Sequence, residues 1–151
     1  MGIFVKIKRS IKNSIREYVE TDKLIKKGLV VGKNFFIGKD VEIDYDFCWL
    51  IEFGNNVTLA PGVRVLAHDA SIRRVLGITR IGVVEVGDNV FIGADSIVLP
   101  GVRIGSNIII AAGSVITSDL ESNYVYAGNP ARKIYKIEDY ILKHKYPQKY
   151  I

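Results

Sequence analysis

The chain has 151 residues, enough for one domain with a substantial core, and its 48% hydrophobic and 25% charged residues are an ordinary globular balance. No apolar run reaches the roughly 18 residues of a membrane span, and a single cysteine, Cys48, excludes an internal disulfide, which fits a cytoplasmic protein. The apolar N-terminus is interrupted by Lys6, Lys8 and Arg9, so it does not resemble a cleaved signal peptide.

The formal net charge of +5 is concentrated at the two ends of the chain. Residues 1–27 carry a net charge of +5 and residues 132–151 carry +4, whereas residues 28–131 carry −4. No basic stripe is interleaved with stacking aromatic residues, so no nucleic-acid partner is expected. Solvated basic ends are the simplest interpretation. Alternatively, the basic ends contact an anionic membrane surface, at the inner face of the membrane, or bind a polyphosphate ligand.

Residues 1–27 are predicted to form an amphipathic helix that ends near Gly28. Ile3, Ile7, Ile11 and Ile15 recur at steps of four, and lysines occupy the opposite face. Such a helix would cap the next element or pack on a neighbour, or else lie on a membrane surface.

From residue 28 onward the chain repeats in steps of six residues, a period that fits neither a helix nor a simple strand. Each step opens with an aliphatic or aromatic residue, which a small residue usually follows. This period predicts an all-β solenoid, a parallel β-helix in which three steps close a triangular coil of about 18 residues and the opening side chains point inward. The opening residues are Ile37, Phe53, Leu59, Val65, Val86, Ile92, Val98, Ile104, Ile110 and Ile116.

The corners between the steps contain residues that favour tight turns. Some tolerate left-handed backbone angles, and the Pro-Gly pairs fit type II turns. The corner segments are Gly54-Asn55-Asn56, Pro61-Gly62, Gly87-Asp88-Asn89, Pro100-Gly101 and Gly105-Ser106-Asn107.

The period is interrupted after His68 by a lateral loop at about residues 69–84. His68 is the fourth residue of its step, the place that Gly101 occupies one coil later, so it should lie at a corner and point away from the core. An inserted loop on a regular solenoid often holds the functional site. A histidine there is a suitable general base near neutral pH, for example toward a hydroxyl or amine that attacks an activated carbonyl.

The segment from Asn123 to Ile137 is predicted to return as an extended strand, which completes a β-helix domain over residues 28–137. Glu138 to Lys145 is predicted to be a short helix within a C-terminal tail, residues 138–151. With only two histidines and one cysteine, the chain cannot assemble a histidine-rich zinc site alone, and no metal is expected.

The hexapeptide runs, with WLIEFGNNVTLAPGVRVLAHDAS (49–71), VGDNVFIGADSIVLPGVRIGSN (86–107) and the ending AAGSVITSDL…YAGNPARKI, resemble the left-handed β-helix acyltransferases. The most similar branch contains the maltose and galactoside O-acetyltransferases and relatives that modify bacterial polysaccharides. The resemblance implies a left-handed coil, a homotrimer with sites between subunits, acetyl-CoA as donor and His68 as catalytic base.

The resemblance also assigns coenzyme positions to Ala94, Ala112, Thr117 and Arg132, with small side chains leaving room for the pantetheine arm. Arg132 and Lys133 would meet the coenzyme phosphates, or else form a solvated basic tail. Family members often have a lysine where this chain has Ser118, so one phosphate contact is in question.

The acceptor pocket is less well defined by the sequence. Asp44 and Asp46 are candidates for binding the acceptor or for orienting His68, and Trp49 is expected to pack rather than to bind a sugar. The predicted function is O-acetylation of a sugar or glycan precursor by acetyl-CoA. N-acetylation of an amino sugar and a non-catalytic trimeric scaffold are the alternatives.

Overall fold

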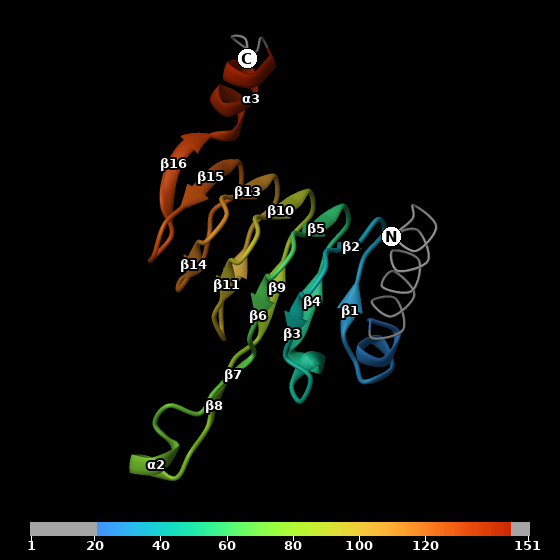
Figure 1. Ribbon diagram of the computed structural model, residues 1–151, viewed down its shortest axis with the longest axis vertical. Coiled ribbons are helices and arrows are strands. Elements are labelled where there is room, and N and C mark those ends of the chain that lie inside the picture. Colours follow the sequence, from blue (N-terminus) through green and yellow to red (C-terminus); the bar gives the residue numbers. More distant parts are fainter. Residues whose placement is uncertain (1–20, 146–151) are drawn as a thin grey trace, which may run out of the picture.

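The structure is a computed structural model that describes residues 21–145 of the chain. Its main body is a three-sided prism of stacked coils, each contributing one short strand to each of three parallel sheets (Figure 1). The first sheet contains β1 (Val30–Val31), β4 (Ile51–Phe53), β9 (Val84–Val86) and β12 (Arg103–Ile104). The second contains β2 (Phe36–Ile37), β5 (Val57–Leu59), β10 (Val90–Ile92), β13 (Ile108–Ile110), β15 (Tyr124–Ala127) and the antiparallel β16 (Arg132–Lys136). The third contains β3 (Glu42–Ile43), β6 (Arg64–Val65), β11 (Ile97–Val98) and β14 (Val115–Ile116).

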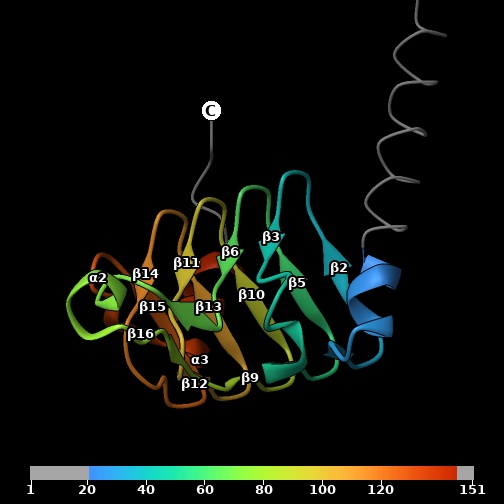
Figure 2. The ribbon, with the colours of Figure 1, turned by 90° about the horizontal axis from the view of Figure 1, so that it is seen from below.

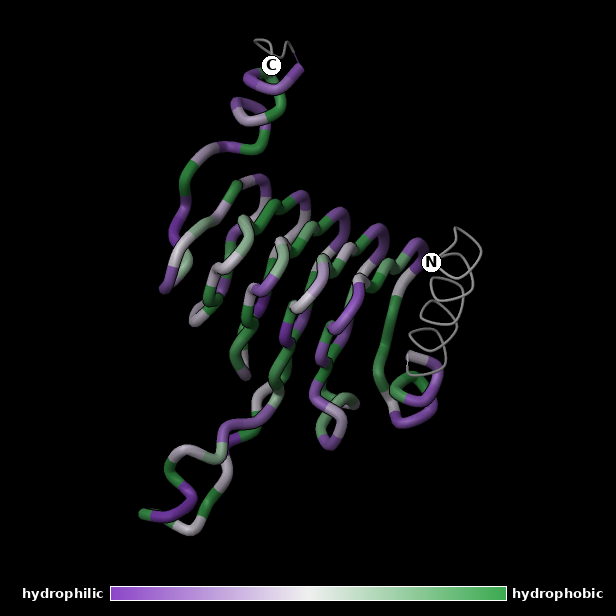
Figure 3. Tube along the Cα trace, viewed as in Figure 1, coloured by the Kyte–Doolittle hydropathy of each residue, from purple (hydrophilic) through white to green (hydrophobic). Residues whose placement is uncertain are grey.

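The opening residues of the hexapeptides stack on one another inside the prism, as the period predicts. Along the second sheet, Leu59 pairs with Ile92 and Ile92 with Ile110, and all three side chains are fully buried. The other two sheets repeat this arrangement with Phe53 and Val86 and with Val65 and Val98. Each coil therefore supplies part of a continuous apolar core, and the same alternation of polar and apolar segments recurs from coil to coil (Figure 3).

Two insertions disturb the regular coil length, and both leave the prism between the third and first sheets. Corresponding corner asparagines of the two regular coils, Asn89 and Asn107, are 18 positions apart, the predicted coil length. The separation rises to 22 between Asn34 and Asn56 and to 33 between Asn56 and Asn89. The extra residues form the loop 44–50, which includes the short helix η1 (Cys48–Leu50), and a long lateral arm.

The lateral arm is a β-hairpin that projects far from the prism (Figure 1). It consists of β7 (His68–Asp69), the short helix α2 (Arg73–Leu76) and β8 (Arg80–Ile81). After β8 the chain returns to the prism at Gly82. A side chain does not fit there, because a Cβ atom on Gly82 would lie only 2.5 Å from the backbone nitrogen of Gly101. The predicted loop, at about residues 69–84, corresponds to this arm, because the chain rejoins the first sheet at Val84.

The corner between the first and second sheets is a ladder of asparagine side chains. Five asparagines share a left-handed backbone conformation with φ between 55° and 70°. The side-chain amide of each of the first four donates to the side-chain oxygen of the next over 2.8–3.0 Å. These turns line up along one edge of the prism (Figure 2). The residues are Asn34, Asn56, Asn89, Asn107 and Asn123.

The two ends of the described chain cover the ends of the solenoid. At one end, residues 21–26 are helical, and the Leu24 carbonyl accepts hydrogen bonds from the backbone of Leu29 and the thiol of Cys48. At the other end, the predicted extended segment consists of two strands, because β16 folds back on β15. The predicted short helix follows as α3 (Ile137–Lys145). The predicted apolar face at Ile3, Ile7, Ile11 and Ile15 lies outside the described residues. Within residues 21–145, no helix is both long and apolar enough to cross a membrane.

We expect Asn89→Ala to destabilise the protein more than Asn89→Gly. Both variants lose the two ladder hydrogen bonds, but only alanine must place a Cβ atom in a left-handed conformation with φ of 56°, which costs about 1–2 kcal/mol. Urea unfolding midpoints of the two variants and the wild type would measure the difference. Equal midpoints for the two variants would show that the corner does not impose this backbone constraint.

Candidate functional site

His68 lies at the corner between the third and first sheets, where the lateral arm leaves the prism. It is the first residue of β7, and the chain before it, Arg64–Val65, belongs to the third sheet. Its side chain is 37% exposed, so the imidazole is accessible to a reactant, while its backbone is held in β7. The predicted corner position of His68 is therefore the observed one.

A buried carboxylate holds the inner side of the His68 ring. Oδ2 of Asp44 forms a short hydrogen bond with Nδ1 of His68 and also accepts one from the backbone N–H of Ala67 at 3.0 Å. Oδ1 of Asp44 accepts a hydrogen bond from the backbone N–H of Phe47 at 3.2 Å. Because the Asp44 side chain is only 2% exposed, it positions His68 and is not itself available to an acceptor.

The loop 44–50 brings this carboxylate to the histidine. Asp44 directly follows β3, and its backbone N–H donates to the Val65 carbonyl of the next coil, so the loop begins in register with the strand that leads to His68. Phe47 packs its ring against the imidazole, with centroids 5.1 Å apart. The imidazole is thus held by a carboxylate at one edge and by an aromatic ring beside it.

The environment of Asp44 favours its ionised form. Burial by itself raises the pKa of the carboxyl, but the hydrogen bonds from His68, Ala67 and Phe47 outweigh burial and leave the pKa below its usual value. An ionised Asp44 accepts a hydrogen bond from Nδ1–H of His68. In the imidazole tautomer that carries its proton on Nδ1, Nε2 has a lone pair that can accept a proton.

The other two candidates in this loop, Asp46 and Trp49, do not contact His68. Asp46 is exposed and forms no hydrogen bond or ion pair with another residue of the described chain. Trp49 packs its Cβ atom against Gly28, but its side chain is 54% exposed, so the expectation of packing holds only for the base of the side chain. Of the two aspartates, the structure therefore joins only Asp44 to the histidine. The sequence carries no local signal for this choice, because the loop 44–50 departs from the six-residue period.

Ala94 and Ala112 occupy equivalent corners of neighbouring coils, as predicted. They follow the paired residues Ile92 and Ile110, and the Ala94 carbonyl accepts a hydrogen bond of 2.7 Å from the backbone of Gly113. Both lie at the corner between the second and third sheets. Ala112 is exposed and Ala94 is half-buried.

Thr117 and Ser118 lie at a different corner from the two alanines. They follow β14 and are exposed at the corner between the third and first sheets, the same corner of the prism as His68. The third sheet therefore separates the two predicted sets of coenzyme contacts within one chain.

Arg132 and Lys133 begin β16 and are both exposed. The guanidinium of Arg132 donates to the neighbouring Ala131 carbonyl at 3.0 Å and forms no ion pair with a described residue. Lys133 is already engaged: its ammonium lies 2.6 Å from the Glu121 carboxylate and above the Tyr124 ring. The Glu121 carboxylate raises the pKa of Lys133. Because Lys133 is paired with Glu121 and Arg132 forms no ion pair with a described residue, Arg132 is the cation of the two that is open to a phosphate.

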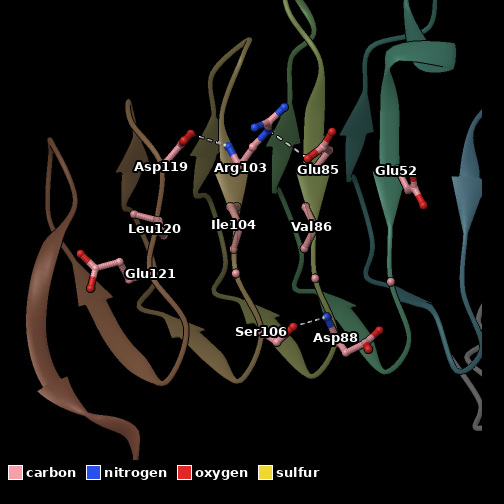
Figure 4. A pocket seen from close by; sticks show the side chains of 13 residues that line it. Glu52, Glu85, Val86, Asp88, Arg103, Ile104, Ser106, Asp119, Leu120 and Glu121 are labelled. Carbon is pink, nitrogen blue, oxygen red and sulfur yellow. Dashed lines mark hydrogen bonds and ion pairs between the residues drawn. The ribbon is translucent and has the colours of Figure 1, made fainter.

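A separate hollow of about 720 Å³ lies on the outer face of the first sheet (Figure 4). Its carboxylates outnumber its single cation, Arg103, which is paired with Glu85 at 3.0 Å. It contains none of the predicted site residues. The residues that line it are Glu52, Gly54, Glu85, Val86, Gly87, Asp88, Arg103, Ile104, Gly105, Ser106, Asp119, Leu120 and Glu121. Among residues 21–145, no group of three or more His, Cys, Asp or Glu side chains is arranged to hold a metal ion.

Comparison with known proteins agrees with the coil geometry. A family model described as the hexapeptide repeat of succinyl-transferase matches residues 83–118. Protein CapG of Staphylococcus aureus is 37% identical over 142 residues, which cover 91% of this chain and 83% of CapG. The chain belongs to the hexapeptide-repeat acyltransferase family.

Solved structures of this family show the same left-handed β-helix. A maltose O-acetyltransferase from Clostridium difficile 630 superposes with a TM-score of 0.63 at 47% identity, covering 71% of this chain and 58% of that one. A galactoside acetyltransferase in complex with coenzyme A gives a TM-score of 0.66 at 28% identity, covering 83% and 73%. The chain spans only 54–59% of the length of the next curated relatives, so it matches their β-helix rather than their whole length.

The protein should lose stability more steeply on acidification than its Asp44→Asn variant. The pKa of Asp44 is lower in the folded state than in the unfolded chain, where it is about 4, so the unfolded chain binds more protons as the pH falls. The stabilisation is present above pH of about 5 and disappears as the pH falls through the folded pKa. Urea midpoints between pH 3 and 6 would measure this slope.

Asp46→Asn is the matched control, because Asp46 lies in the same loop but is exposed and makes no such contacts. Its midpoints should follow those of the wild type across this range. Parallel curves for the wild type and Asp44→Asn would show that Asp44 does not titrate with a lowered pKa.

Proposed function

We propose that the protein is an acetyl-CoA-dependent O-acetyltransferase that acetylates a hydroxyl group of a sugar or glycan precursor. The main support is the pair formed by the buried Asp44 and the accessible His68 on a hexapeptide-repeat scaffold. The names of its relatives agree with this chemistry, since they include a maltose O-acetyltransferase and a galactoside acetyltransferase with bound coenzyme A.

His68 acts as the general base in this mechanism. Its Nδ1–H donates to Asp44, and Nε2 removes the proton from the acceptor hydroxyl as the oxygen attacks the thioester carbonyl carbon. The tetrahedral intermediate collapses with cleavage of the carbon–sulfur bond, and the proton passes from His68 to the departing thiolate. The products are the acetyl ester and free coenzyme A. Asp44 stabilises the imidazolium between these two steps.

The coenzyme is proposed to lie along the corner that contains Ala94 and Ala112, with Thr117, Ser118 and Arg132 as further contacts. Small side chains at successive corners let an extended pantetheine chain approach the backbone. Arg132, which forms no ion pair with a described residue, is suited to a phosphate.

A homotrimer would explain why these groups are divided between two corners. In one chain the third sheet separates the two alanines from His68, whereas a rotated neighbour can bring its own His68 to the alanine corner. Each site would then use the histidine of one subunit and the alanine corner of the next, with three equivalent sites in a closed ring.

We expect His68→Ala to lower kcat by about 10² to 10⁴-fold, the usual contribution of a general base. Coenzyme A binding should be retained, because the alanine corner is unchanged. Thiol release from acetyl-CoA with a panel of sugars would measure the activity. His144→Ala is the control, since His144 lies on α3 and hydrogen-bonds only to the Tyr140 carbonyl.

The same assay separates the proposed activity from its alternatives. Mass spectrometry of the product distinguishes an ester, which hydroxylamine cleaves, from the amide of an amino sugar. Full turnover in His68→Ala would eliminate the proposed base. A purified protein that binds no acyl-CoA would indicate a scaffold rather than an enzyme.

Ala112→Leu should raise the KM for acetyl-CoA about tenfold or more, because the added side chain fills the space proposed for the pantetheine arm. Stability should change little, since Ala112 is exposed. Lys33→Leu, which adds an apolar side chain at another exposed corner, is the control. Steady-state kinetics with varied acetyl-CoA would measure both variants.

Mixing the two impaired variants tests whether the site is shared. When His68→Ala and Ala112→Leu subunits refold together, a shared site regains one intact pairing per mixed trimer, and activity at low acetyl-CoA should rise above that of either variant. Activity that stays at the level of the separate variants would place each site within a single subunit.

A further inference from the structure

An exposed aromatic and cationic surface lies at the end of the prism formed by the first coil. We call it the tryptophan patch, and it consists of Lys23, Ile25, Lys26, Lys27, Tyr45 and Trp49. Its three apolar side chains are unusually open to solvent: Ile25 is 41% exposed, Tyr45 58% and Trp49 54%. Clustered apolar side chains of this size mark an interaction surface more often than single exposed ones do.

Printed contacts join the two segments of the patch into one surface. The ammonium of Lys27 lies 3.5 Å from the centre of the Tyr45 ring. Gly28, which follows Lys27, lies against Trp49, since a Cβ atom on Gly28 would be 2.8 Å from Cβ of Trp49. The Gly28 backbone also donates to the Ile25 carbonyl at 3.0 Å. The end of residues 21–28 therefore lies against the loop 44–50, with Lys27 beside Tyr45 and Gly28 beside Trp49.

The charge of the patch is positive. Lys23, Lys26 and Lys27 are all exposed, and none forms an ion pair with a carboxylate of the described chain. The acidic residues on the same two segments are Asp22, the exposed Asp46, and Asp44, which is buried and paired with His68. The sequence of residues 1–27 has a net charge of +5, so the cationic character extends beyond the patch.

We propose that the tryptophan patch docks the protein on an anionic lipid bilayer. Tryptophan and tyrosine favour the headgroup level of a membrane, where an apolar ring and a polar edge are both satisfied. Neighbouring lysines extend to anionic headgroups while their methylene chains stay in the apolar layer. A shallow surface of this kind binds reversibly, and more weakly than a spanning helix.

Docking through this patch also places the candidate site near the bilayer surface. The loop 44–50 contains Tyr45 and Trp49, and the same loop contributes Asp44 and Phe47 to the surroundings of His68. The base is therefore tied rigidly to the docked surface. This part of the inference rests on the proposed function, whereas the docking itself does not.

Trp49 provides a direct test, because it is the only tryptophan in the chain. Its fluorescence in the full-length protein should shift to shorter wavelength on addition of vesicles containing phosphatidylglycerol, and lipids with brominated acyl chains should quench it. Vesicles of phosphatidylcholine alone should produce little change. An unchanged Trp49 spectrum with anionic vesicles would overturn the proposal. No enzymatic activity is needed, so failure of the acetyltransferase assay leaves this result interpretable.

Charge variants test the contribution of the lysines. Lys26→Glu with Lys27→Glu should weaken vesicle binding by at least twentyfold, since each lysine near an anionic surface contributes about a fivefold effect. Arg74→Glu on the exposed helix of the lateral arm is the control and should bind as the wild type does. Equal weakening by both would indicate non-specific attraction of a basic protein and would overturn the assignment to the patch.

Tyr45→Ser tests the apolar contribution without removing the reporter, and should also weaken binding. Phe91→Ser, at an apolar residue 44% exposed on the second sheet, is its control. A second copy of the chain is the competing occupant. If Trp49 emission already lies at short wavelength without lipid and moves to longer wavelength as the protein is diluted, the patch is a subunit interface and the proposal is wrong.

Discussion

The stacking of inward-facing side chains from coil to coil is the constraint on which the rest of the structure depends. Leu59, Ile92 and Ile110 can form one buried column only if successive coils stay in parallel register. Extra residues are then tolerated only at corners, where the chain can leave and return without breaking a ladder. Both insertions follow this rule and leave the same corner. The loop 44–50 and the lateral arm are thereby brought together, and Asp44 meets His68 at their roots.

The chemistry of the corner follows from the burial of one carboxylate. A buried charge is costly unless donors surround it, and Asp44 receives hydrogen bonds from two backbone N–H groups and from His68. Those bonds keep the pKa of Asp44 low and hold the imidazole in one orientation. Its outer edge stays accessible at a point where the arm can shape an acceptor pocket. The same interaction therefore compensates the buried charge and orients the histidine that is proposed as the base.

The triangular section of the prism also determines which corners lie close together within one chain. Corners are separated by whole sheets, so Ala94 and Ala112 do not lie beside the His68 of their own chain. The proposed ring of subunits would bring these two corners together. The loop that positions His68 also displays Tyr45 and Trp49 at the end of the prism, so one short insertion links the reactive corner to an outer surface.

The sequence by itself determined the solenoid, its coil length, its corners and the position of His68, because a six-residue period fixes which side chains point inward. It also indicated the end of the N-terminal helix near Gly28 and the short helix after Ile137. The choice of Asp44 over Asp46 and the exposure of Trp49 required the tertiary structure. These residues lie in a loop that departs from the period. Their directions depend on contacts with residues more than 20 positions away, such as the hydrogen bond that His68 donates to Asp44, which no local pattern records.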